Sequence, residues 1–444
     1  MVKSSKPHVA LFASPGLGHL IPIVELAKRL IAQHGFTVTV FAVTTEAGRA
    51  EDELLRSATS SWPGLFDTVV LPNVVDDSLG VEPKTGIIPR MLGMVRGALP
   101  TLRSSISEMV VKPTAIIVDQ FGIEAVKVLA EEFDVLKYVF IASNAWFLAY
   151  NAYLPYVQNK VDPNKMFYIP GCESIPGRDL LQLTFDPNCR AYRDFASIGR
   201  DIMTVDGILV NTWEDLEPRT LAAFKDDLSM KSIVKVPVYP IGPIIGRPKQ
   251  PDESVVYVSF GSGGTISTQQ TIELAWGLEL SKHRFIWVIR PPIENDRSAS
   301  LFKSVHDLDD SISKCLPKGF LDRTRDLGIV VSKWVPQEEI IRHRSVGGFS
   351  IVNGVPIIAW PLYAEQNMNA TMLSENLGIA IRPEGKPSEV LVGREEIERM
   401  VKCVMDNEEF GLRRRVKDLK KSAYEALKEG GSYCALSKIA KDLK

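Results

Sequence analysis

Residues 334–366 read WVPQEEIIRHRSVGGFSIVNGVPIIAWPLYAEQ, and the rest of the chain is interpreted around this stretch. It opens with an indole, a proline and an amide, and an apolar run near its end leads to Glu365 and Gln366. A flat base stacks well on an aromatic face such as that of Trp334. A sugar ring, which carries many hydroxyls, bonds to fixed carboxylate and amide groups such as those of Glu365 and Gln366. The pattern therefore favours a nucleotide-sugar site.

Composition limits the class of protein. The chain has 444 residues, of which 45% are hydrophobic, so it is long enough for two domains with separate cores. A net charge of −2 argues against a nucleic-acid partner or an anionic membrane surface. No apolar run reaches the roughly 18 residues of a spanning helix, and the apolar run near the start is too short for a secretory signal.

Cysteine usage points to a reducing compartment. The five cysteines are few, odd in number and scattered, without CxxC or metal-ligand spacing. The acidic pairs at 226–227 and 309–310 lie in polar stretches and are interpreted as solvated. We therefore expect a cytoplasmic protein, active as a monomer, with no bound metal and no disulfide framework.

Strand and helix patterns alternate along the chain. Apolar strand patterns at 8–14, 36–43 and 115–119 are separated by helical patterns such as 20–33, which is typical of a parallel sheet with crossover helices. The alternation stops at 236–249, which is rich in proline, and then restarts. We predict an α/β protein with two doubly wound parallel-sheet domains, at 1–240 and 253–444, joined by a linker at 241–252. The last helix is expected to pack back on the first domain.

The motif SPGLGH at 14–19 lies between the first strand and the first helix. Loops at the carboxyl ends of strands bind ligands in open α/β sheets, and Gly16 and Gly18 permit a tight turn and a close approach. His19 falls near the helix start, where it is either a functional group or a structural cap. The motif lacks the third glycine of a dinucleotide fingerprint, and the next strand ends without an acidic residue.

Asp119 ends the apolar run at 115–118. The same topological rule places it at the carboxyl edge of a strand in the sheet that holds His19. An alternative is that Asp119 only caps the helix that starts near Gly122. A histidine and an aspartate at one sheet edge could form a general-base pair, in which the carboxylate orients the imidazole.

Several motifs together resemble the plant UDP-dependent glycosyltransferases, which have the two-domain GT-B fold. They are WxPQ, HxSVGGF and GVPIIAWPLYAEQ within 334–366, and SPGLGH, VDQFG, VNTWEDLEP and VSFGSGG before it. The likeness covers nearly the whole chain and is strongest for the branch that glucosylates phenols such as hydroquinone and monolignols. It implies two Rossmann-like domains facing a central cleft.

The resemblance also implies roles for individual residues. It makes His19 and Asp119 the catalytic pair, and it assigns a donor-binding set to UDP-glucose. The set comprises Gly18, Ser262, Trp334, Val335, Gln337, Glu365 and Gln366. In it Ser262 holds phosphate, Trp334 and Gln337 hold uracil, and Gln366 points to glucose. By position alone, Ser262 could equally mark a simple turn and Trp334 a core residue.

The acceptor pocket is less well defined by sequence. Phe121, two residues after Asp119, and the aromatic-rich run 143–156 could line an apolar slot for a planar phenol. We assign Phe121, Ser143, Trp146 and Tyr363 to this pocket. Most of the run has helical spacing, which more often marks a hydrophobic core.

One departure from the family pattern affects the function. The family has a His-Cys-Gly-Trp-Asn-Ser segment and a ribose-binding glutamate after GGF, whereas here Ser350 is followed directly by Ile351. That segment resembles a strand-to-helix turn that holds the diphosphate. Either the transferase is inactive, or residues are missing from this sequence at Ser350–Ile351 and near Lys249–Gln250.

The sequence therefore predicts an inverting glucosyltransferase that uses UDP-glucose and a small aromatic hydroxyl compound. Two other interpretations stay open. One is a binding protein that has kept the fold and lost the diphosphate site. The other is a nicotinamide-dependent oxidoreductase, suggested by two Rossmann-like halves and opposed by the missing third glycine and ribose acid.

Overall fold

The computed structural model describes ten segments of the chain, and all structural statements concern these segments. They are residues 6–43, 48–73, 86–157, 161–244, 255–261, 264–292, 315–332, 354–406, 411–428 and 430–443. The chain forms two compact units, each considered separately. The first contains Met1–Arg178, Gln182–Ile245 and Glu425–Lys444, and the second contains Asp179–Leu181 and Gly246–Tyr424.

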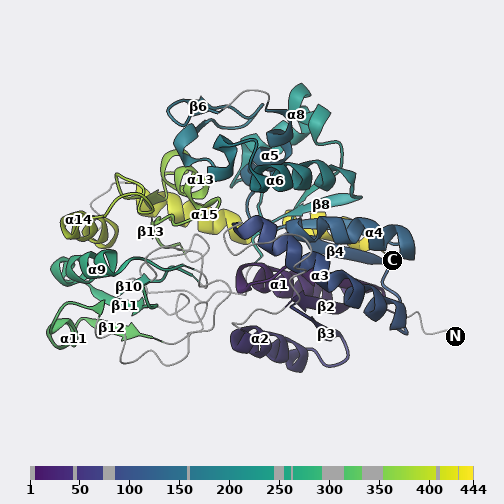
Figure 1. The fold of residues 1–444 in the computed structure, drawn as a ribbon, viewed down its shortest axis with the longest axis horizontal. Coiled ribbons are helices and arrows are strands. Elements are labelled where there is room, and N and C mark those ends of the chain that lie inside the picture. The colour runs from purple at the N-terminus through teal and green to yellow at the C-terminus, as the bar shows by residue number, and fades with distance from the viewer. Residues whose placement is uncertain are drawn as a thin grey trace. The chain divides into compact units, whose positions relative to one another are not determined.

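A seven-stranded sheet organises the first unit (Figure 1). Its strand order is β3-β2-β1-β4-β5-β8-β9, and every neighbouring pair is parallel. The order reverses between β1 and β4, which makes this pair the topological switch point where doubly wound sheets bind ligands. The strands are β1 (His8–Ala13), β2 (Thr37–Val43), β3 (Phe66–Leu71), β4 (Ala115–Asp119), β5 (Leu136–Ile141), β8 (Gly207–Val210) and β9 (Val238–Pro240).

Helices cover both faces of this sheet. Contacts group α1 with α2 and α16, and group α3 and α4 with α6. A short antiparallel hairpin, β6 (Met166–Phe167) and β7 (Ile175–Pro176), precedes α6. The helices are α1 (Leu17–His34), α2 (Gly48–Ser61), α3 (Ile87–Glu108), α4 (Ile123–Phe133), α5 (Ala145–Tyr153), α6 (Arg190–Asp201), α7 (Pro218–Asp226), α8 (Leu228–Ile233) and α16 (Ser432–Asp442).

The core of the first unit lies between the sheet and helix α1, which covers one of its faces. The strands contribute β-branched and aromatic side chains, and α1 contributes a leucine- and isoleucine-rich stripe. Leu436 and Ile439 of the last helix, α16, are buried in the same cluster. The C-terminal end of the chain is therefore part of the first unit's core, although it is far from it in sequence.

The second unit is also built from parallel strands and helices. β10 (Val255–Val258), β11 (Arg284–Val288) and β12 (Gly328–Val331) form one parallel sheet, and β13 (Ile357–Ile358) pairs with β14 (Ala380–Ile381). Buried side chains of β11 pack with α9 and α14. The helices are α9 (Thr268–Ser281), α11 (Phe320–Arg323), α13 (Gln366–Thr371), α14 (Arg394–Met405) and α15 (Leu412–Ala426), and the π turn η8 (Met372–Asn376) follows α13.

The predicted α/β class with parallel sheets is confirmed, and two local predictions are wrong. The strand–helix alternation is expected to stop at 236–249, but strand β9 lies within this stretch, just before the predicted linker at 241–252, because an edge strand tolerates proline at its end. The first helix begins at Leu17, so Gly18 lies inside it and not in the turn before it. Across the ten described segments, no helix has both the length and the apolarity needed to cross a membrane.

Candidate active site

The switch point brings together residues that are about a hundred positions apart in sequence. β1 and β4 pair in parallel, with Phe12 opposite Val118. Ser14 and Asp119 therefore leave the sheet side by side at its carboxyl edge. Gly16 makes the turn into α1 with a φ of 104°, a left-handed value that favours glycine. This turn delivers His19 in the first turn of α1.

The structure brings His19 and Asp119 into contact. His19 Nδ1 lies 3.2 Å from Asp119 Oδ2. The aspartate side chain is buried, with 3% of its surface exposed, while the histidine side chain is 27% exposed. A proton on Nδ1 that is held by the carboxylate leaves the imidazole lone pair on Nε2. The arrangement is that of a base whose tautomer is set by its partner.

Four further contacts fix the Asp119 carboxylate. Ser14 donates its backbone N–H to Oδ2 at 2.8 Å and its hydroxyl to Oδ1 at 2.5 Å. The backbone N–H groups of Phe121 and Gly122 donate to Oδ1 at 3.1 and 3.3 Å. Burial alone would raise the pKa of Asp119, but the charge of His19 and hydrogen bonds from His19 and Ser14 lower it overall. The carboxylate is therefore ionised and rigidly oriented at neutral pH.

The Asp119 side chain makes two kinds of contact. The side chain caps the 3₁₀ turn Gln120–Gly122, as the structural alternative requires, and its other oxygen faces His19. Ser14 was not assigned a role from sequence. A hydroxyl directly after a buried strand is a weak signal, and only the register between β1 and β4 shows which residue it meets.

Phe121 and Gly18 shape the surroundings of His19. The Phe121 ring packs edge-on to the imidazole, with ring centroids 5.4 Å apart at an interplanar angle of 75°. A Cβ at Gly18 would meet no atom within 4 Å, so the described protein atoms leave open space there. The imidazole therefore has an apolar neighbour in Phe121, and the backbone at Gly18 is not covered by side chains of the described residues.

Two more predicted acceptor residues, Ser143 and Trp146, differ in exposure. Ser143 is half-buried in the turn before α5. Trp146 is buried, and its indole N–H donates to the carbonyl of Glu173 at 3.1 Å. The structure therefore favours the core interpretation for Trp146.

Glu217 is a buried carboxylate that sequence reasoning did not single out. It accepts the backbone N–H groups of Ala145 and Trp146 at 2.8 Å each and the hydroxyl of Thr212 at 2.5 Å. Burial raises the pKa of Glu217, and these hydrogen bonds oppose the rise without cancelling it. Its carboxylate holds the N-terminus of α5 in place.

In the second unit, residues at the end of the 334–366 stretch lie together. Gln366 Oε1 accepts the backbone N–H of Leu362 at 2.8 Å, which fixes the orientation of the amide and leaves its NH₂ group as the donor. Burial raises the pKa of Tyr363, and the charge of Glu365 raises it further. Arg290 and a hydrogen bond with Gln366 lower that pKa in part. Tyr363, which was assigned to the acceptor pocket, thus lies near Arg290 and near the predicted donor residues Glu365 and Gln366.

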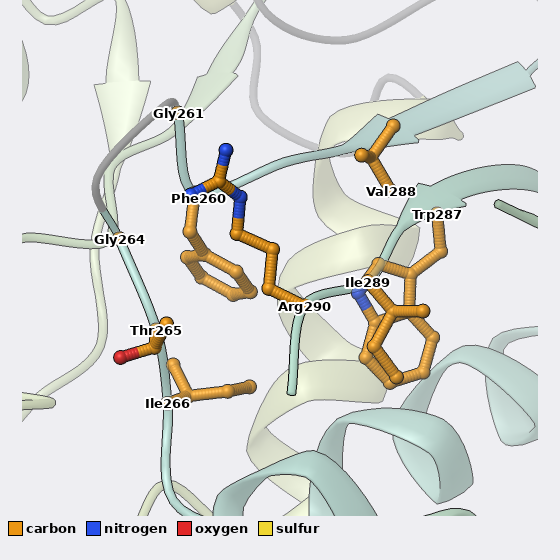
Figure 2. A pocket seen from close by; sticks show the side chains of 9 residues that line it. All are labelled: Phe260, Gly261, Gly264, Thr265, Ile266, Trp287, Val288, Ile289 and Arg290. Carbon is orange, nitrogen blue, oxygen red and sulfur yellow. The ribbon is translucent and has the colours of Figure 1, made fainter. Parts of the chain in front are cut away.

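Arg290 also lines a pocket that was not predicted. Figure 2 shows its side chain extending from the end of β11 toward Phe260 and Gly261. Burial lowers the pKa of Arg290, and Tyr363 opposes that shift. Within the described segments, Thr265 Oγ1 on the same pocket is buried without a hydrogen-bond partner. The pocket is lined by Phe260, Gly261, Gly264, Thr265, Ile266, Trp287, Val288, Ile289 and Arg290.

Several predicted features lie outside the described residues. These are Ser262, Trp334, Val335, Gln337, and the joins at Ser350–Ile351 and Lys249–Gln250. Among the residues that are described, no group of three or more histidine, cysteine or acidic side chains could hold a metal ion. All five cysteines are described, and none of them forms a disulfide.

Comparison with known proteins identifies the family. The chain is 45% identical to UDP-glycosyltransferase 72E1 of Arabidopsis thaliana, over 99% of this chain and 96% of the relative. The chain belongs to the plant UDP-glycosyltransferase family. Residues 240–411 match the family described as UDP-glucoronosyl and UDP-glucosyl transferase, and hydroquinone glucosyltransferase of Rauvolfia serpentina is 40% identical over 98% of this chain and 97% of its own length. The resemblance deduced from the motifs is thus confirmed.

Solved structures of family members share the fold. TcCGT1 in complex with UDP superposes with a TM-score of 0.91 at 40% identity, covering 99% of both chains. A UDP-glucosyltransferase from Polygonum tinctorium, capable of glucosylating indoxyl and solved with 3,4-dichloroaniline, gives a TM-score of 0.83 at 33% identity over 99% of both chains. These similarities establish the GT-B fold for this chain.

The alignments also bear on the shortened stretch. The alignment with UDP-glycosyltransferase 72E1 runs over 478 positions, which exceeds the 444 residues of this chain. The relative therefore has residues that face gaps in this chain. This agrees with a segment that the family has and this sequence lacks.

Proposed function

We propose that this UDP-glycosyltransferase transfers glucose from UDP-glucose to a hydroxyl of a small aromatic acceptor, giving a β-glucoside. The observation that carries the proposal is the contact between His19 and the buried Asp119 at the switch point of the first sheet. Relatives named for glucosylation, including one named for hydroquinone, support the donor and the acceptor class.

The mechanism is a single displacement. His19 Nε2 takes the proton from the acceptor hydroxyl while that oxygen forms a bond to the anomeric carbon. The bond from the anomeric carbon to the diphosphate oxygen breaks on the opposite face, and UDP leaves with the electron pair. Asp119 stabilises the imidazolium as it forms, a role for which its low pKa and fixed orientation are suited.

On the donor side, we assign sugar recognition to Glu365 and Gln366. An ionised carboxylate only accepts hydrogen bonds, while the NH₂ of Gln366 donates them, so the two groups complement neighbouring sugar hydroxyls. We assign the base and the phosphates to Trp334, Val335, Gln337 and Ser262. Because the sugar arrives activated, no covalent intermediate enters the proposal, and we expect no bound metal.

Product analysis tests this proposal. The purified full-length chain is incubated with UDP-glucose and a panel of phenols, and products are identified by mass spectrometry. The anomeric proton coupling in NMR then reports the stereochemistry. We expect a β-glucoside and stoichiometric UDP, and an α-linked product would refute the single displacement.

A second candidate is a binding protein without transfer activity. The alignment that is longer than this chain favours it, since a real loss of the phosphate-holding segment would weaken the donor site. Calorimetry with UDP and UDP-glucose separates the candidates, because the enzyme must bind both and turn over the second. The mass of the intact natural protein shows whether residues are missing from this sequence.

We also propose that the protein is cytoplasmic and monomeric. Size-exclusion chromatography tests the monomeric state.

A further inference from the structure

A buried polar cluster in the second unit joins segments that lie far apart in the sequence. Asp179 Oδ2 accepts the hydroxyl of Thr371 at 2.8 Å and an N–H of Arg382 at 3.1 Å. Arg382 also donates to the Thr371 oxygen at 2.9 Å and to Glu375 at 2.5 Å. The two groups that bond to Asp179 Oδ2, from Thr371 and Arg382, thus also bond to each other.

Asp179 is unusual in its place along the chain. Residues Asp179–Leu181 are the one part of the chain before residue 246 that is assigned to the second unit, and they lie outside the 240–411 region that matches the family. The Asp179 side chain is buried, with 2% of its surface exposed. A buried carboxylate is costly unless hydrogen bonds and an opposite charge compensate it, and Thr371 and Arg382 supply both.

The helix that the cluster holds carries the predicted sugar-binding residues. α13 starts at Gln366, is preceded by Glu365 at its N-cap position, and ends at Thr371. The chain then continues through the π turn η8, which contains Glu375, the other partner of Arg382. The cluster therefore fixes the far end of a six-residue helix whose near end presents Glu365 and Gln366. π turns inside helices often occur near functional sites.

We propose that Asp179 is a positioning residue for sugar recognition, acting through Thr371 and Arg382 to hold α13 so that Glu365 and Gln366 meet the hexose. This inference rests on the proposed function, since it assumes that those two residues contact the sugar. Functional groups need to be held within about 0.5 Å of their working geometry, so a loosened helix weakens sugar contacts before it unfolds. Base and phosphate recognition are assigned to other segments and should be spared.

The proposal is tested by comparing UDP with UDP-glucose. Titration calorimetry measures both affinities for the unmodified chain, Thr371→Val and Asp179→Asn. Thr371→Val removes two hydrogen bonds, one donated to Asp179 and one accepted from Arg382, and each corresponds to a change of at least about two- to tenfold. We expect Thr371→Val to weaken UDP-glucose binding by that factor and to change UDP binding by less than about twofold. Where turnover is measured, KM for UDP-glucose should rise more than KM for the acceptor.

A matched control separates positioning from general packing. Thr324 is also a buried threonine of the second unit, and its hydroxyl donates within its own turn to the Phe320 carbonyl at 2.8 Å. Thr324→Val should leave the ratio of UDP-glucose to UDP affinity unchanged. Thr371→Ser, which restores the hydroxyl, should recover most of the affinity for UDP-glucose.

The outcomes distinguish this inference from the proposed function. If the unmodified chain binds neither UDP nor UDP-glucose, the proposed donor is wrong. If it binds both and Thr371→Val weakens them equally, or no more than Thr324→Val does, the positioning role of Asp179 is overturned. Failure of Thr371→Ser to recover affinity would overturn it as well. If Asp179→Asn does not fold, the comparison of Thr371→Val with Thr371→Ser still tests the positioning role.

Discussion

Replacing Asp119 with asparagine tests the proposed catalytic pair most directly, because the two side chains have nearly the same shape. The carboxylate accepts from Ser14 through both the backbone N–H and the hydroxyl, from two backbone N–H groups of the following turn, and from His19. An asparagine that keeps its oxygen at the Oδ1 position places NH₂ at the Oδ2 position. There it faces the N–H of Ser14 at 2.8 Å and Nδ1 of His19 at 3.2 Å.

Two effects follow from that geometry. The Ser14 N–H loses its acceptor, which should cost about 1–3 kcal/mol of stability. The imidazole is driven to the tautomer with its lone pair on Nδ1 and its proton on Nε2, so it cannot take the acceptor proton. The expected loss in kcat/KM is about 10²–10⁴ with an alkyl alcohol. It should be smaller with a phenol, whose pKa near 10 makes proton loss easier.

The assay compares kcat/KM for a phenol and an alkyl alcohol in wild type, Asp119→Asn and His19→Ala, with UDP affinity as a check on the donor site. Asp227→Asn is the matched control, because Asp227 caps α8 by accepting the Met230 N–H at 2.9 Å. The control should keep wild-type activity, and His19→Ala should lose activity while retaining UDP binding. Equal losses with both acceptor types in Asp119→Asn would refute the tautomer argument.

Three further predictions concern single side chains. Ser14→Ala removes a hydrogen bond to a charged group, which is worth about 1.5–3 kcal/mol. This should raise the pKa of Asp119 and shift the acidic limb of the pH profile of kcat/KM to higher pH. An unchanged profile would count against the role of Ser14. Gln366→Ala removes the NH₂ donor that Leu362 orients, so the preference for UDP-glucose over UDP-galactose should shrink; an unchanged preference in competition assays would place selectivity elsewhere. For Glu217, whose pKa is raised in the folded state, the stabilising contribution is present below the ordinary glutamate pKa of about 4.3 and is lost as pH rises through the folded value. Glu217→Gln should flatten the pH dependence of the free energy of unfolding, measured with urea, over that pH range. It should also cost about 1–3 kcal/mol of stability, because one backbone N–H loses its acceptor. If the pH dependence stays the same, Glu217 is not its source.

The fold was predictable because its signals are local. Buried parallel strands leave short apolar runs, and helices leave a 3.6-residue period, so the helical pattern predicted at 20–33 lies within α1. β9 was misjudged because prolines usually mark linkers, and the sequence does not show that a strand will lie at the edge of the sheet.

Part of the candidate site could also be deduced from sequence. His19 and Asp119 each follow a predicted strand, and the rule that ligands gather at carboxyl ends places them at one edge. The aromatic run at 143–156 shows the limit of this reasoning. Helical spacing of large apolar residues is the same for a core helix and for a pocket wall, and only packing shows that Trp146 is buried with its indole bonded to Glu173.

The sequence alone thus determined the family, the α/β class, the positions of several strands and of the first helix, and the residue types at the carboxyl edge of the first sheet. These depend on local periodicity and on short motifs. Tertiary structure decided which residues complete each site. Strand register brought Ser14 to Asp119, and the return of Asp179 to the second unit brought it to Thr371 and Arg382. Such contacts join residues about one to two hundred positions apart. Buried polar groups need hydrogen-bond partners, and the folded chain determines which distant residues become those partners. No local pattern in the sequence predicts these pairs.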